Sequence, residues 1–196
     1  MAQKPIDNIS IKVLGKWNTK LFQPEWIINN LFEDRKQIIV LFNFEEREIG
    51  FKVDDIVFFP KDDKMIIQIE PDEDTKEFKE DSMIIGTKLM LKILKLLPHT
   101  PIESLDFDIS FLLDKDDKFS KFITDSSGKL INDFIIDKYR LNKKSDDYNL
   151  DILVSKEKDE KFKVIFVFQY NNYKNLKDDI LVYNLKESIK LLNGKE

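Results

Sequence analysis

Hydrophobic residues follow two kinds of spacing along this chain. Short segments carry apolar residues in runs or at every second position and end at acidic turns, which is typical of β-strands. Longer segments repeat apolar residues every three or four positions, which is typical of amphipathic helices. In the first half this pattern predicts a strand at residues 9–17, a short helix at 23–32, strands at 37–44, 47–53, 55–60 and 64–70, and then a long helix.

The long helix has recognisable start and stop signals. Asp74 is a candidate N-cap with Glu77 three residues later, and lysines collect towards the other end, where Pro98 stops the helix. The apolar positions are numerous enough to predict packing over a sheet, and they are Phe78, Ile85, Leu89, Ile93, Leu96 and Leu97.

The second half repeats this order of elements. The pattern predicts a strand at 102–113, a short helix at 117–127, strands at 133–142, 148–156 and 161–170, and a long helix at 176–192. Corresponding elements are separated by about 95 to 99 residues, which is the signature of a repeat. We therefore expect an α+β fold made by tandem duplication of a β-α-β-β-β(β)-α unit. Repeats 1–98 and 99–196 would pack as one compact domain, with a curved antiparallel sheet and two long helices on one face.

This order of elements resembles the saddle of the TATA-binding protein family. The resemblance implies two units related by a pseudo-twofold axis, with the long helices on the convex side of the sheet. Two ferredoxin-like or otherwise independent α+β units are the alternative interpretation.

Two short segments carry a second resemblance. The W-N-x3-F-x-P-x-W segment from Trp17 to Trp26 and the L-P-H-T-P segment from Leu97 to Pro101 are similar to segments of uncharacterised bacterial proteins found in mobile-element and phage-defence settings. The resemblance implies an accessory, regulatory or immunity-like role and carries no known activity.

Composition and charge narrow the classes of function. The formal net charge is −5, and the lysines are dispersed, so a role in binding nucleic acid phosphates is disfavoured. The chain has no cysteine, which excludes disulfides, thiolate metal sites and a cysteine nucleophile. The apolar runs are too short to cross a bilayer, so we expect a cytoplasmic protein without a membrane partner.

The single histidine lies between two prolines. Pro98 and Pro101 disfavour helix in the residues before them, so the segment around His99 is predicted to be a rigid joint between the halves. A catalytic or ligand role for His99 is the alternative, although the chain offers no second histidine to support it.

The strand at 102–111 places two carboxylates on one face. Leu105, Phe107, Ile109 and Phe111 alternate with Ser104, Asp106, Asp108 and Ser110. Asp106 and Asp108 are therefore weak candidates for a divalent cation site, with a solvated sheet face as the simpler interpretation.

An aromatic group spans the first strand and the short helix. Trp17, Phe22 and Trp26 are candidates for a partner-binding surface, and packing of the helix on its sheet is the alternative.

No motif for a cofactor is present: the five glycines are scattered and form no phosphate-binding loop. We therefore expect a non-catalytic protein-binding module without a cofactor, whose partner is another protein or a second copy of the chain. The alternatives are a nucleic-acid-binding saddle and a metal-dependent enzyme that uses Asp106 and Asp108.

Overall fold

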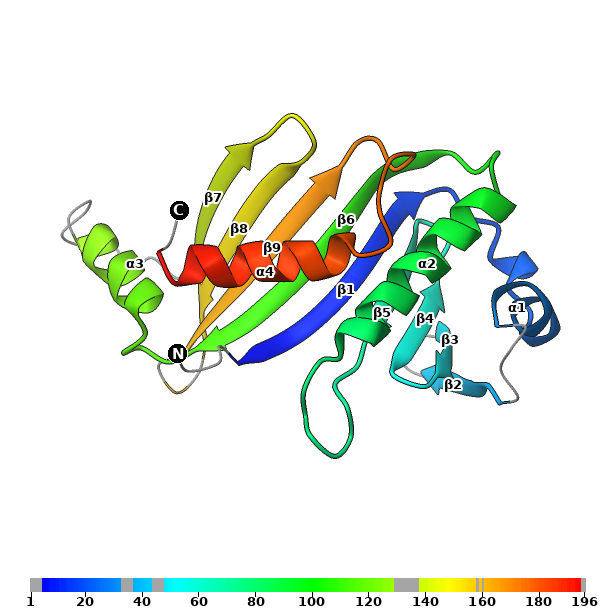
Figure 1. The fold of residues 1–196 in the computed structure, drawn as a ribbon, viewed down its shortest axis with the longest axis horizontal. Helices are drawn as coiled ribbons and strands as arrows, with labels where there is room; N and C mark the ends of the chain where they lie inside the picture. The colour runs from blue at the N-terminus through cyan, green and yellow to red at the C-terminus, as the bar shows by residue number, and fades with distance from the viewer. Residues whose placement is uncertain are drawn as a thin grey trace.

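The described part of the chain forms one open antiparallel sheet with four α-helices (Figure 1). The computed structural model describes residues 5–32, 37–43, 48–128, 138–157, 159 and 161–194. The strands are β1 (Ile6–Gly15), β2 (Ile39–Asn43), β3 (Glu48–Val53), β4 (Ile56–Pro60), β5 (Lys64–Ile69), β6 (Ile102–Leu113), β7 (Lys138–Lys144), β8 (Asn149–Lys156) and β9 (Phe162–Tyr170). The predicted α+β class is confirmed.

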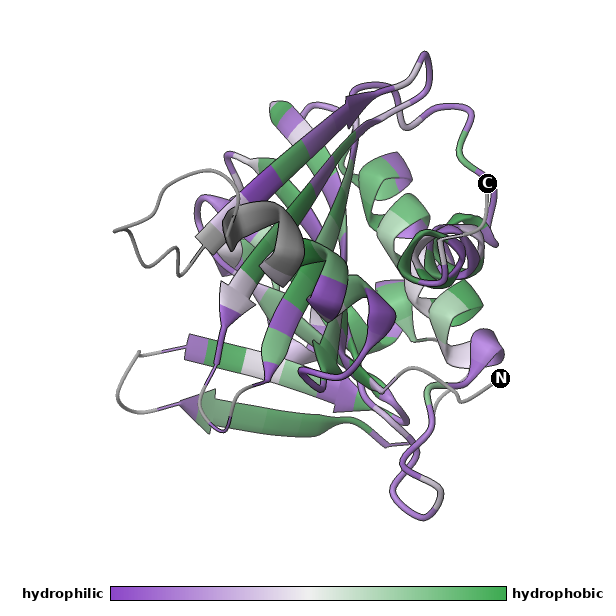
Figure 2. Ribbon diagram, turned by 90° about the vertical axis from the view of Figure 1, so that its left-hand side faces the viewer, coloured by the Kyte–Doolittle hydropathy of each residue, from purple (hydrophilic) through white to green (hydrophobic). Residues whose placement is uncertain are grey.

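The helices have two kinds of position. The long helices α2 (Glu80–Leu96) and α4 (Ile180–Leu192) lie on the same face of the sheet (Figures 1 and 2). The helices α1 (Pro24–Leu31) and α3 (Lys118–Gly128) lie at its two ends (Figure 1). A 3-10 turn, Thr19–Leu21, precedes α1. Within the described part of the chain, no helix is long and apolar enough to cross a membrane.

The strand order is β2-β3-β4-β5-β1-β6-β9-β8-β7. The first strand of each half, β1 and β6, pair with each other at the centre, and β5 and β9 lie outside them. In the first half α2 follows β5, which pairs with β1, and in the second half α4 follows β9, which pairs with β6. The elements are therefore arranged alike on either side of the centre of the sheet. The predicted strand at 133–142 is described only from Lys138 onwards, because residues 133–137 lie outside the described part.

The helix-covered face of the sheet carries the core. The predicted alternation in β6 is confirmed on this side, because Leu105, Phe107, Ile109 and Phe111 are all buried. The ring of Phe107 meets Tyr170 of β9 edge-on, with the ring centroids 5.5 Å apart. The core is therefore continuous across the β6 and β9 pair.

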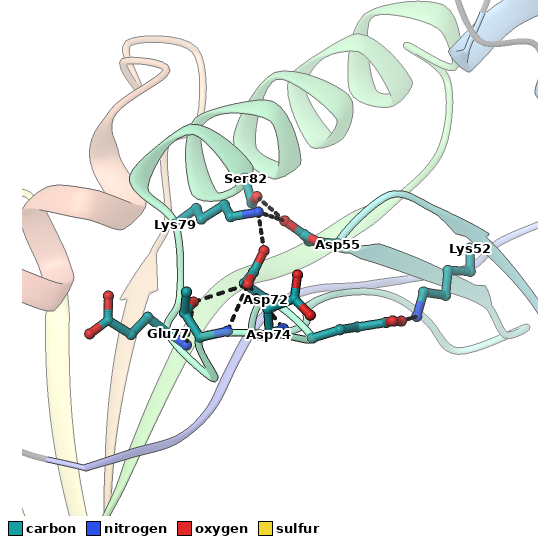
Figure 3. Close-up of polar contacts among 9 residues, drawn as sticks. Lys52, Asp55, Asp72, Asp74, Glu77, Lys79 and Ser82 are labelled. Carbon is teal, nitrogen blue, oxygen red and sulfur yellow. Dashed lines mark hydrogen bonds and ion pairs between the residues drawn. The ribbon is translucent and has the colours of Figure 1, made fainter.

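The start and the packing of α2 differ from the prediction. The helix begins at Glu80 rather than Asp74, because the Asp72 carboxylate accepts the backbone N–H groups of Asp74 and Thr75 and holds them in a turn (Figure 3). Lys79, the N-cap residue, forms an ion pair with Asp72. The buried side chains also differ, since Ile85 and Leu96 are exposed and the helix buries Met83, Leu89, Met90, Ile93 and Leu94.

The segment around His99 connects α2 to β6. Pro98, His99 and Pro101 are exposed, and the Pro101 carbonyl oxygen accepts a hydrogen bond from the Lys16 backbone N–H at 3.1 Å. The connection is thus attached to the end of β1. The imidazole of His99 in this connection is exposed.

Replacing Gly15 with alanine is expected to destabilise the protein by about 1–3 kcal/mol, because a Cβ there would lie 2.4 Å from the Pro101 carbonyl oxygen and force the backbone apart. Urea unfolding measures the loss. The control is His99→Ala, which is expected to stay within about 0.5 kcal/mol of the wild type because the side chain is exposed. Equal stability of Gly15→Ala and the wild type would contradict the close approach.

Candidate binding surface on the open face of the sheet

The face of the sheet opposite α2 and α4 combines polar and aliphatic side chains. We call it the open face, and Figure 2 shows both long helices on the other side. The strand register places one row of Gln68, Ser10, Asp108, Val167 and Asp151 across five strands, and a neighbouring row of Ile66, Lys12, Asp106 and Gln169. Ile165 and Leu153 form a further pair beyond the first row.

Asp106 and Asp108 lie at the centre of the open face. Asp108 is only 8% exposed and forms an ion pair with Lys12 on the adjacent strand β1. Among the described residues, no hydrogen-bond donor reaches the buried Oδ1 atom of Asp106 or that of Asp108. The interpretation of a solvated sheet face therefore does not hold at Asp108, which is buried.

Burial raises the pKa of the Asp106 carboxyl above its usual range, and the nearby charge of Asp108 adds to this effect. Hydrogen bonds from Gln169 and Ser104, together with the Lys12 charge, act in the opposite direction. Burial is the largest contribution, so Asp106 is a carboxylate held in a position that disfavours its charge.

Replacing Asp106 with asparagine is expected to stabilise the protein at pH 7, because the neutral amide avoids the cost of a partly buried charge. A folded-state pKa above the unfolded value means that the native state binds the proton more tightly. The wild-type stability contributed by this group therefore falls as the pH rises from about 4 through the raised folded-state pKa.

Urea unfolding of both proteins between pH 4 and pH 8 measures this effect. The difference in unfolding free energy, variant minus wild type, should increase with pH, while other carboxyl groups affect both proteins equally. A difference that does not depend on pH would contradict the burial of a charged Asp106.

The acid pair lacks the surroundings of a metal site. The described residues contain no group of three or more histidine, aspartate or glutamate side chains that could hold a metal ion. Lys12 also directs its ammonium group to Asp108, which is unfavourable beside a divalent cation. Among the described residues, the fold therefore brings no third metal ligand to Asp106 and Asp108, which the metal-dependent alternative would need.

Basic side chains on the open face are engaged by carboxylates. The Lys163 ammonium lies 2.8 Å from Asp7, and Arg140 lies 2.6 Å from Asp151. The hydrogen bond from Lys163 lowers the pKa of Asp7. These pairs neutralise one another, so the described side chains of the open face present little unpaired positive charge to a phosphate backbone.

The ion pair between Lys52 and Glu70 continues this arrangement towards the edge of the sheet. Their charged atoms are 2.7 Å apart, and the bond from Glu70 is the largest cause that raises the pKa of Lys52. Pairs of opposite charge therefore occur on the open face in both halves of the chain.

The aromatic group takes a packing position. Trp17 and Phe22 are only 5% and 4% exposed, while Trp26 is partly buried. The Phe22 ring lies edge-on to both Trp26 and Phe58, with centroids 5.5 and 5.4 Å apart, and so seats α1 against the sheet. Of these three aromatic side chains, Trp26 therefore has the most exposed surface for contact with a partner.

Sequence reasoning identified Asp106 and Asp108 but missed the residues that surround them. Lys12 and Gln169 come from the two adjacent strands, β1 and β9, and lie beside the acids only through strand pairing. The alternation within each strand was a visible signal, but the register between strands was not.

Comparison of the sequence with models of known protein families, and with curated proteins, finds no match.

Proposed function

We propose that this chain is a non-catalytic protein-binding module and that the open face is its contact surface. The observation that carries the proposal is the composition of this face across β5, β1, β6, β9 and β8. Partly buried aliphatic side chains, such as Ile66, Ile165 and Val167, alternate there with charges that pair among themselves. Such a surface suits a protein partner, because the apolar positions supply contact area.

The two halves, 1–98 and 99–196, are proposed to be tandem repeats that form a curved saddle like that of the TATA-binding protein. The matching positions of β5 and β9 beside the central pair support this origin. The long helix at the end of each half lies on the same face, which also supports it.

The charge pairs favour a protein over a nucleic acid as the partner. A saddle that bound nucleic acid would need cations free to contact phosphates. Here Lys12, Lys163 and Arg140 face Asp108, Asp7 and Asp151, and the chain as a whole is acidic. A cytoplasmic accessory role, regulatory or immunity-like, in a bacterial defence or mobile-element setting is the proposed context.

Capture with the tagged full chain from a bacterial host tests the class of partner. Mass spectrometry of the eluate identifies stoichiometric protein, the absorbance ratio reports nucleic acid, and light scattering of the purified chain reports self-association. We expect a stoichiometric protein or a defined homo-oligomer that survives moderate salt. A monomer without any protein partner, or salt-sensitive retention of nucleic acid, would overturn the proposal.

A further inference from the structure

A cavity of about 460 Å³ lies away from the open face, between the turn from β7 to β8, the end of β9 and the start of α4. Tyr148, Tyr170 and Tyr183 are among the residues that line it. The rings of Tyr148 and Tyr170 meet at 48°, with their centroids 5.6 Å apart, and so form an aromatic corner.

The aromatic corner is held in place from behind. The Tyr170 hydroxyl donates a hydrogen bond of 2.9 Å to Oδ1 of the buried Asn184 on α4. The Tyr148 ring packs against Phe168, with the centroids 5.3 Å apart. A ligand would therefore meet rings whose positions are already set, which lowers the entropic cost of binding.

The charges around the cavity are mainly negative. Asp146, Asp147 and Asp179 line it together with Lys177, so these charged groups sum to −2 from three carboxylates and one ammonium. Asp179 is the N-cap of α4 but makes no side-chain capping bond, and its carboxylate offsets the partial positive charge of the helix start.

The pKa of Tyr148 responds both to burial and to nearby negative charge. Burial raises the pKa of Tyr148, and the neighbouring Tyr183, Glu187 and Asp147 raise it further. A negatively charged environment that disfavours a phenolate favours a cation.

The corresponding place in the first half contains an ammonium group of the chain itself. The turn from β3 to β4 and the start of α2 form a hollow lined by acids that include Asp55, Asp72 and Asp74. Lys79 reaches into this cluster, forms an ion pair with Asp72 and lies 3.6 Å from Asp55 (Figure 3). Lys79 is the N-cap of α2, whereas the N-cap of α4 is Asp179. The second half therefore has a carboxylate where the first half supplies a cation.

We propose that the tyrosine-lined cavity binds an organic ammonium cation. The ammonium group would lie against the faces of Tyr148 and Tyr170, where the ring quadrupole attracts it. Asp146, Asp147 and Asp179 would neutralise its charge. An anion is disfavoured because Lys177 is the lone basic side chain among the described residues that line the cavity.

Calorimetry with the full chain tests this site with choline, with n-butylamine and with 3,3-dimethyl-1-butanol, the neutral isostere of choline. At least one of the two cations is expected to bind one to one, with a dissociation constant on the order of 1 mM or below, and the isostere at least about tenfold more weakly. Tyr148→Leu and Asp147→Asn should each weaken cation binding by about three- to tenfold. Asp74→Asn, the same change at the first-half hollow, should leave it unaltered.

Thermal unfolding of the two cavity variants establishes that they fold. Tyr148→Leu removes a ring that packs against Phe168, whereas Asp147→Asn changes an exposed side chain and does not disturb packing. Absence of binding by both cations, equal binding of the neutral isostere, or unchanged affinity in Asp147→Asn would overturn the proposal.

Discussion

Replacement of Phe107 with alanine is expected to lower the free energy of unfolding by about 3–5 kcal/mol. Phe107 is fully buried on β6, the strand that joins the two halves, and its ring packs edge-on against Tyr170. Loss of the ring would leave a cavity at the centre of the sheet, and urea unfolding measures the cost.

The same experiment tests whether the halves unfold together. Both tryptophans, Trp17 and Trp26, lie in the first half, so their fluorescence reports on that half, whereas far-UV circular dichroism reports on the whole chain. We expect both signals to shift to the same lower midpoint, because β1 and β6 share one ladder. A tryptophan midpoint that stays at the wild-type value would contradict a single cooperative unit.

The matched control for Phe107 is Phe122→Ala on α3. Phe122 is largely exposed, so removal of its ring is expected to change stability by less than about 0.5 kcal/mol.

Replacement of Lys12 with methionine is expected to destabilise the protein by about 1–3 kcal/mol. The change keeps most of the side-chain volume but leaves the Asp108 carboxylate enclosed without its ammonium partner. The expected loss is smaller than for a fully buried pair because the Lys12 side chain is 37% exposed. Thermal and urea unfolding at pH 7 measure it.

A double variant separates the ion pair from simple packing. Lys12→Met combined with Asp108→Leu removes both charges, and we expect it to recover most of the stability that Lys12→Met loses. If the stability lost by the double variant equals the sum of the losses in Lys12→Met and Asp108→Leu alone, the two side chains do not interact.

The alternation of apolar residues predicted the elements because each strand places one face in the core. Residues 102–111 show this most clearly, since the apolar set of β6 is buried under the long helices. The order of elements was likewise predicted, because turn residues and helix ends are local signals.

Local signals also produced the error at α2. Asp74 with Glu77 has the spacing of a capping box, but Asp72 captures the N–H groups of Asp74 and Thr75, and the helix starts at Glu80 instead. Which acidic residue holds the start of α2 also depends on the position of the Asp55 carboxylate. This carboxylate accepts a hydrogen bond from Ser82 and lies close to Lys79, and both are tertiary contacts.

The candidate site could be predicted only in part for a similar reason. Asp106 and Asp108 share a face by their spacing in one strand, whereas their contact with Lys12 depends on the pairing of β6 with β1. Phe22 packs against Phe58 of β4, and Trp17 packs against Phe22, and the spacing within one segment does not reveal the contact with Phe58.

The most direct test of the open face as the contact surface compares two leucines on neighbouring strands. Leu153 of β8 lies on the open face and is 36% exposed, and Leu141 of β7 lies on the opposite face and is 42% exposed. The measurement is the amount of captured partner, or of homo-oligomer, for Leu153→Glu and Leu141→Glu at equal protein concentration. We expect Leu153→Glu to reduce binding at least tenfold and Leu141→Glu to retain it. Full binding by Leu153→Glu, with or without loss in Leu141→Glu, would contradict the open face as the contact surface.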